Sequence, residues 1–126
     1  VYAERSLATH GHNYAPLRCT LRNWWDGARV REISISQFGD AEGSHATPSE
    51  VSLSYFAYPE SVKSVDMAPT QAPRGTIRDA DDYRRQFPDG RIGSDPSLAS
   101  VNIGARIYVA AVADVTEHYD AFMGLS

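Results

Sequence analysis

A histidine and a glutamate that stand close together are the residues best suited to chemistry. His45 lies just before Thr47-Pro48-Ser49-Glu50, in which Thr47 can cap a helix and Glu50 can close the capping box. The positive end of that helix dipole disfavours the imidazolium form of His45. Its neutral imidazole can then serve as a general base or a metal ligand, and Glu50 can set its tautomer. A solvent-exposed histidine beside a purely capping glutamate is the simpler interpretation.

Two further histidines, His10 and His12, are separated by one residue in a polar stretch. Such a pair can bind a metal ion in an extended conformation, with nearby carboxylates completing the site. Two histidines in a polar loop are also often only solvated. We therefore keep His10 and His12 as an alternative metal site, which can include His45 across subunits.

Trp24 and Trp25 end a segment, from Leu17, in which apolar and polar residues alternate. A period of two predicts a half-buried strand, and the carboxyl ends of strands border the ligand crevice of an α/β sheet. We expect one tryptophan to face the core and the other to face away, although both can be packing residues. Both are candidate substrate-binding residues. Glu42, in the loop over residues 39–44 that we expect to be flexible, is a third.

The elements that must position these residues are mainly helices. We expect helices over residues 28–38, from Pro48 to near Tyr58, and over residues 79–87, with a long irregular connection over residues 61–78. Asp95 and Pro96 resemble the start of the last helix. That helix carries an apolar stripe that we expect to pack on a sheet or on other helices: Val101, Ala105, Tyr108, Val112, Val115, Tyr119 and Phe122.

Length and charge bound the class of protein. A chain of 126 residues has the length of one domain. Its net charge of -4 disfavours binding to nucleic acid, and no apolar run is long enough to span a membrane. The single cysteine gives no sign of secretion, so we expect a cytoplasmic protein. Residues 1–5 resemble the end of a helix entered in the middle. We therefore expect residues 1–126 to be a single domain or a fragment.

A family resemblance rests on three blocks that occur in order between residue 17 and about residue 110. They are the tryptophan-ended segment, the stretch from His45 to Leu53 followed by Tyr58-Pro59-Glu60, and the stretch from Asp89 to Pro96. Together these blocks resemble the second half of the creatininase (creatinine amidohydrolase) family. The resemblance implies an α/β fold, part of a three-layer αβα sandwich with a long C-terminal helix. It also implies a homo-oligomer and a hydrolase that uses divalent metal ions, namely zinc, manganese or magnesium.

In that family a metal-activated water attacks a cyclic amide, a formamide or a similar C–N bond. The resemblance implies that His45 is the catalytic histidine that moves a proton near the leaving nitrogen. It implies that Glu50 supports the site and that Trp24 or Trp25 covers a small amide substrate. Ala41 stands where some members have a second tryptophan, which makes creatinine itself a less expected substrate.

The largest departure concerns the metal ligands, which the family takes mostly from its first half. The motifs Glu-x-His-Gly-x-His and Asn-Gly-His-x-x-Asn are absent from this sequence. We therefore expect the chain to be the C-terminal half of a creatininase-like amidohydrolase, to bind no metal and to be inactive alone. The alternative is a non-enzymatic module that self-associates or binds a partner.

Overall fold

The computed structural model describes residues 18–125. Its α-helices are α2 (Ala28–Phe38), α3 (Pro48–Ala57), α4 (Ala80–Gln86) and α5 (Val101–Met123). Short 3-10 helices are η1 (Trp24–Asp26), η2 (Gly39–Glu42), η3 (Pro59–Ser61) and η4 (Pro96–Leu98). Over these residues extended chain is paired only at an isolated bridge between His45 and Ile92. The long C-terminal helix is confirmed, whereas the described residues do not confirm the αβα sandwich.

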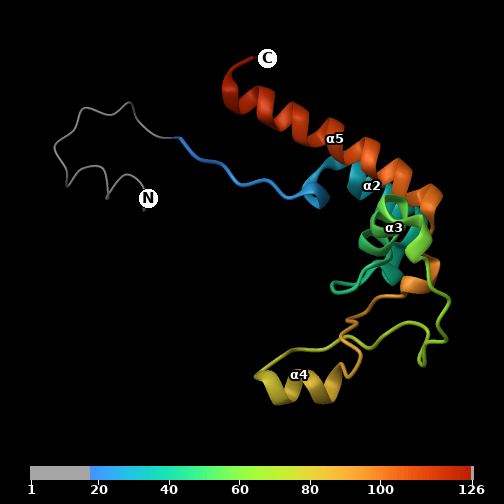
Figure 1. The fold of residues 1–126 in the computed structure, drawn as a ribbon. Helices are drawn as coiled ribbons and strands as arrows, with labels where there is room; N and C mark the ends of the chain where they lie inside the picture. The colour runs from blue at the N-terminus through green and yellow to red at the C-terminus, as the bar shows by residue number, and fades with distance from the viewer. Residues whose placement is uncertain (1–17, 126) are drawn as a thin grey trace.

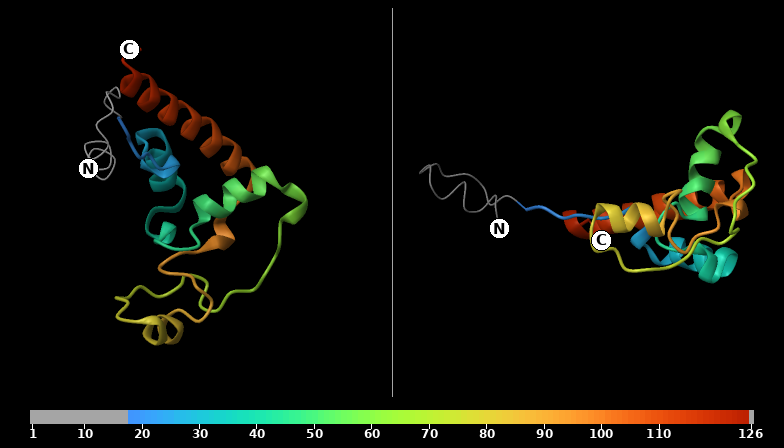
Figure 2. Two further views of the ribbon diagram at one scale, coloured as in Figure 1. Left: turned by 60° about the vertical axis from the view of Figure 1, so that its left-hand side comes forward. Right: turned by 90° about the horizontal axis from the view of Figure 1, so that it is seen from below.

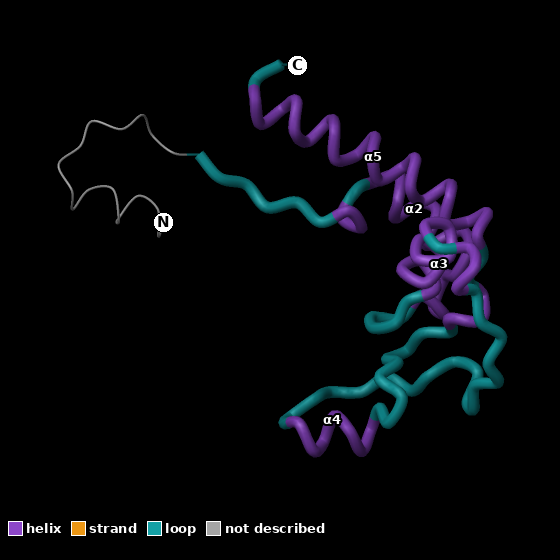
Figure 3. Tube along the Cα trace, viewed as in Figure 1, coloured by secondary structure: helices purple, strands orange, loops and turns teal. Residues whose placement is uncertain are grey.

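Helix α5 is the longest element, and α2 and α3 lie against its N-terminal half (Figures 1 and 3). The core lies at this junction, where Val30 and Phe38 of α2 pack with Ile107, Ala110 and Ala111 of α5. Partly buried apolar side chains from η1, α2, α3 and α5 surround it, namely Trp24, Ile33, Leu53 and Ile103. These contacts explain why residues 28–38 form a helix although their sequence is ambiguous, because tertiary packing stabilises an amphipathic face.

Small residues let α3 and α5 approach closely. Ser52 is fully buried, and a Cβ atom placed on Gly104 would lie 1.9 Å from the Ser52 carbonyl oxygen. The Ser52 hydroxyl also accepts a hydrogen bond of 3.1 Å from the backbone N–H of Ser100, the N-cap of α5. The crossing therefore depends on a residue without a side chain at position 104.

Helix α4 lies apart from this three-helix body, at the end of two long loops (Figures 1 and 2). The loops are joined by the buried side chain of Arg91, which donates to the carbonyl oxygens of Pro69 at 2.9 Å and Thr70 at 2.6 Å. It also pairs with Asp89 at 2.8 Å. The expected short helix and the irregular connection before it are both confirmed.

The predicted strand before Trp25 is wrong for the residues that the structure describes. Residues 18–23 have no regular secondary structure, Leu21 is 86% exposed, and Trp24 and Trp25 belong to η1. A strand needs a neighbouring strand to satisfy its backbone. Here residue 18 is instead held by its side chain, because the Arg18 guanidinium donates to the Phe122 carbonyl oxygen at 3.0 Å and lies over the Phe122 ring.

Two expectations about the last helix are also wrong. Asp95 caps only η4, by accepting from the backbone N–H of Ser97 at 3.0 Å, and α5 begins at Val101 after its own N-cap, Ser100. The expected apolar stripe is largely exposed, since Val112 is 49% and Tyr119 is 55% exposed. The buried face of α5 carries small residues and Ile107 instead, because the close approach of α2 and α3 selects side-chain size as well as hydrophobicity.

The expected flexible loop over residues 39–44 contains the ordered turn η2. The expected helix end at residues 1–5 and the pair His10 and His12 lie outside the described residues. None of the helices within residues 18–125 has the length and apolar character that crossing a bilayer requires.

Candidate functional site

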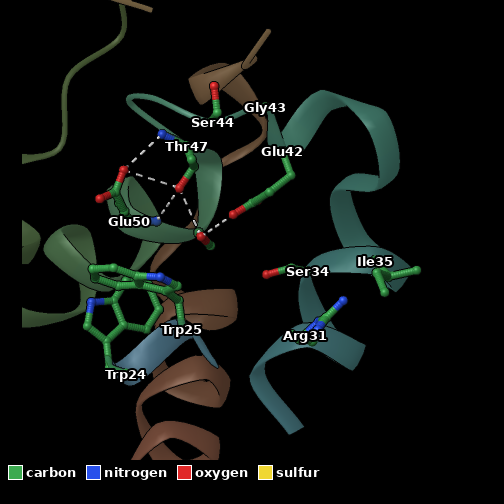
Figure 4. Close-up of a pocket in the computed structure, with 11 residues that line it drawn as sticks. Trp24, Trp25, Arg31, Ser34, Ile35, Glu42, Gly43, Ser44, Thr47 and Glu50 are labelled. Carbon is green, nitrogen blue, oxygen red and sulfur yellow. Dashed lines mark hydrogen bonds between the residues drawn. The ribbon is translucent and has the colours of Figure 1, made fainter. Parts of the chain in front are cut away.

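A cavity of about 440 Å³ lies between η1, α2 and the N-terminus of α3 (Figure 4). Its wall includes four of the five catalytic and substrate-binding residues expected from the sequence, Trp24, Trp25, Glu42 and Glu50. The remaining wall residues come from α2 and from the start of α3 with the turn before it: Arg31, Ser34, Ile35, Gly43, Ser44, Thr47 and Ser49. The fold thus brings together aromatic, acidic and hydroxyl side chains that are distant in sequence.

The two tryptophans have different environments, as expected from their adjacent positions. Trp24 is partly buried and packs on the core, whereas Trp25 is 50% exposed. Their rings meet edge to face, with centroids 5.5 Å apart and planes at 89°. This geometry is favoured for aromatic pairs, and it places the ring of Trp25 against the partly buried ring of Trp24. The cavity therefore has a firm aromatic wall on the η1 side.

His45 is exposed and is not part of the cavity wall, although its neighbour Ser44 is. Its backbone is held firmly, because its carbonyl oxygen accepts from the Ser94 hydroxyl at 2.6 Å and from the backbone N–H of Ile92 at 3.3 Å. Ala46 then adopts a positive φ of 52°, which is uncommon for a residue with a side chain. This turn directs the chain from the bridge into α3.

The capping box predicted at the start of α3 is confirmed. The Thr47 hydroxyl accepts from the backbone N–H of Glu50 at 3.2 Å, and the Glu50 carboxylate accepts from the backbone N–H of Thr47 at 3.2 Å. Within the described residues the hydrogen bonds of that carboxylate go to Thr47, as in the simpler capping interpretation, and none goes to His45. Glu50 orders the rim of the cavity through the helix that it caps.

Glu42 is bound from the opposite side by a residue that sequence reasoning missed. The buried hydroxyl of Ser49 donates to Oε1 of Glu42 and lies 2.9 Å from the Thr47 hydroxyl (Figure 4). Oε2 of Glu42 is buried without a hydrogen-bond partner, and no other side-chain nitrogen or oxygen in residues 18–125 is in that position. The sequence gives no sign of this role for Ser49, because Ser49 lies inside the capping box and Thr47 and Glu50 already explain that motif.

Arg31 and Ser34 were also missed. They lie three residues apart on α2, so they share one helix face, and both reach the cavity. Their spacing in a predicted helix was the available signal. From the sequence, this spacing indicates only a helix face exposed to solvent. The position of α3 is what turns that face into part of the cavity wall.

The residues around the cavity do not make a metal site by themselves. Over residues 18–125 no three side chains of histidine, cysteine, aspartate or glutamate gather closely enough to hold a metal ion. Glu50 is engaged in its capping box, which leaves Glu42 as the available carboxylate of the wall. Two carboxylates, one of them engaged, do not provide the three or more protein ligands of a catalytic metal centre.

The cavity wall combines the aromatic rings of Trp24 and Trp25 with carboxylate and hydroxyl groups, a mixture that is common in ligand pockets. The family model described as Creatininase: Creatinine amidohydrolase matches residues 2–119. The chain belongs to the creatininase family, whose general chemistry is metal-dependent amide hydrolysis. A comparison with curated proteins found no match.

Proposed function

We propose that the chain contributes the substrate-binding part of an amidohydrolase that cleaves the C–N bond of a cyclic amide, a formamide or a related small molecule. The cavity between Trp25 and Glu42 carries this proposal, because it combines an aromatic face with hydrogen-bonding groups. A planar amide can lie against the tryptophan while its polar edge meets the α3 side of the cavity.

Within this proposal His45 is the proton carrier. It directly follows Ser44, which lines the cavity, and we propose that its side chain turns toward the rim when a substrate binds. A neutral imidazole can accept a proton from the attacking water and donate it to the leaving nitrogen. Glu50 acts on the site indirectly, since it caps the helix that carries Ser49.

We further propose that the principal metal ligands lie outside residues 18–125, in keeping with the motifs absent from the sequence. They would come from the N-terminal half of a longer protein or, alternatively, from His10 and His12. We propose that the metal is zinc, manganese or magnesium and that the protein is cytoplasmic. We also propose that the 126-residue chain is inactive alone.

Two measurements test the proposal. Both tryptophans of the chain line the cavity, so tryptophan fluorescence reports ligand binding there directly. We expect saturable changes with N-methylformamide or a small cyclic amide, and a smaller signal in Trp25→Phe. In a full-length protein that carries this half, His45→Ala should abolish most turnover while leaving the metal content unchanged. Normal turnover in that variant would exclude the role of His45.

A second candidate function is assembly with another copy of the chain through α5. The observation that favours it is the exposed apolar row on that helix, which includes Tyr108, Val112, Val115 and Tyr119. Burial of such a row is a general source of association free energy. A homo-oligomer formed in this way is compatible with either an enzyme or a non-enzymatic module.

A further inference from the structure

Four polar side chains, three at the start of α3 and one at the end of η2, form one continuous hydrogen-bonded group. From one side of the cavity wall to the other, the order is Glu42, Ser49, Thr47 and Glu50. We infer that Ser49 is a positioning residue that fixes Glu42, and that the unpartnered oxygen of Glu42 selects ligands that carry an N–H group. This inference rests on the proposed function of the same cavity, and it names the chemistry that the cavity requires.

The directions of the hydrogen bonds follow from counting protons. Glu42 and Glu50 as carboxylates only accept, so the hydroxyl of Ser49 must donate to Glu42. Thr47 already accepts from the backbone N–H of Glu50, and its own proton faces Ser49 at 2.9 Å and Glu50 at 3.3 Å. Ser49 therefore has its single proton committed to Oε1 of Glu42.

Burial makes this arrangement rigid. Ser49 is only 3% exposed, and it lies in the first turn of a helix that is fixed by its capping box. A hydroxyl in that position moves little, so it anchors Oε1 of Glu42 to the start of α3. Glu42 itself lies at the end of η2, directly before Gly43, whose φ of 65° turns the chain away.

The second oxygen of Glu42 then lacks a donor from the protein. A buried acceptor without a hydrogen bond costs free energy, and such atoms are rare in folded proteins. The last side-chain torsion of glutamate is broad, so we infer that the carboxylate turns slightly about its bond to Ser49 when a ligand binds and presents Oε2 to the cavity. An N–H group of a ligand satisfies this oxygen, whereas a fully N-alkylated ligand leaves it unpaired.

The charge and shape of the wall favour the same class of ligand. A planar N–H donor, such as a primary or secondary amide or an amidinium ion, can contact Trp25 with its face and Glu42 with its edge. A quaternary ammonium ion offers the same positive charge to the tryptophan but no proton to Glu42. Comparison of the two ions therefore distinguishes the attraction of the cation to the Trp25 ring from the hydrogen bond to Glu42.

The experiment titrates the 126-residue chain with acetamidinium and, separately, with tetramethylammonium, and follows tryptophan fluorescence. We expect acetamidinium to bind more tightly by about tenfold, as for a hydrogen bond to a charged group. Glu42→Gln and Ser49→Ala should each remove most of that preference. Ser36→Ala is the matched control, because Ser36 is exposed on α2 and is not part of the cavity wall, and it should keep the preference.

Circular dichroism of each variant establishes that it is folded before the titration is interpreted. Equal binding of both ions by the unchanged chain would overturn the role of Glu42. A folded Ser49→Ala chain with undiminished preference would overturn the positioning role of Ser49. If the preference holds while no amide is hydrolysed by the full-length enzyme, only the proposed function fails, so the two results are distinguishable.

Discussion

Asp114 of α5 caps the helix that begins beside Arg29. Its carboxylate accepts from the backbone N–H of Arg29 at 3.1 Å, and the Arg29 guanidinium binds the same carboxylate at 2.7 Å. The N-cap position of α2 is Gly27, which has no side chain to offer. A residue far away in the sequence therefore supplies the cap, and the capping interaction also joins α2 to α5.

Removal of this cap should destabilise the protein. We expect Asp114→Ala to lower the free energy of unfolding by about 1–2 kcal/mol, because it leaves the first N–H groups of α2 without an acceptor. Urea unfolding followed by circular dichroism measures the change. Glu117→Ala is the control, since Glu117 contacts the same arginine at 2.6 Å but is exposed, and it should cost less. Equal losses in both variants would contradict the capping role.

Gly27→Ala should act on the same interaction by steric conflict. The backbone of Gly27 has φ -73° and ψ 151°, which alanine adopts freely, but its Cβ atom would lie 1.9 Å from Oδ2 of Asp114. We expect a loss of about 1–3 kcal/mol, as for an overpacked position. In the double variant with Asp114→Ala the added loss should nearly vanish. Additive losses in this double-mutant cycle would show that the two residues are independent.

Stability should fall in acid. Burial acts to raise the pKa of Asp114, but the Arg29 guanidinium and the N–H groups of Val30 and Arg29 outweigh it and lower that pKa below its usual value of 3.8. Hydrogen bonding to Arg29 likewise lowers the pKa of Glu117 from 4.5. A carboxylate whose folded-state pKa is lowered contributes stability above its unfolded pKa, and this contribution is lost as pH falls.

We therefore expect Asp114 and Glu117 to make the free energy of unfolding depend little on pH near neutrality. Below about pH 4.5 the free energy of unfolding should decline. Urea unfolding at a series of pH values measures the decline. In Asp114→Asn the decline should be shallower, because one of the contributing carboxylates is gone. An unchanged slope in that variant would mean that other acidic residues dominate the acid response.

Some features of the fold follow from local sequence and others do not. The capping box at Thr47 and Glu50 was predictable because all of its partners lie within one helical turn. The cap on α2 was not, because Asp114 is distant and an aspartate inside an amphipathic helix gives no sign of it. The exposed face of α5 was misassigned because Val112 and Tyr119 are more hydrophobic than the small residues that pack against α2 and α3.

Gly104→Ala should test the close crossing of α3 and α5. The added methyl group would overlap the Ser52 carbonyl oxygen, so the helices must separate, and we expect a loss of about 1–3 kcal/mol. Thermal and urea unfolding measure it. Val109→Ala, at an exposed site on the same helix, is the control and should change stability little. A stable Gly104→Ala chain would mean that the crossing is looser than described.

The exposed row on α5 predicts self-association. Val112→Glu should reduce the average mass measured by light scattering after gel filtration, because a charge in an apolar interface is costly. Ala121→Glu adds the same charge at another exposed position of α5, on the side of the helix opposite the apolar row, and should leave the mass unchanged. A monomer in the unchanged chain would contradict assembly through this face.

The candidate site was predictable in its residue types but only partly in its geometry. Trp24, Trp25, Glu42 and Glu50 do meet at one cavity. His45 does not join them, since the pairing with Ile92 and the turn at Ala46 set its direction. The sequence near position 45 indicates neither feature. Ile92 is far away in the sequence, and an alanine such as Ala46 rarely adopts a positive φ.

The segment around Gly93 joins three parts of the chain that are far apart in sequence. Ile92 bonds to Ser44 at 2.9 Å on one side, and on the other Gly93 bonds to Pro73 at 2.9 Å. The irregular connection thus shares a fixed register with the turn that bears His45. Length variation among related proteins should therefore be tolerated near residues 62–66, before this junction. A single deletion at Ile92 or Gly93 would shift the bonds to Ser44 and Pro73, and with them the turn that carries the histidine.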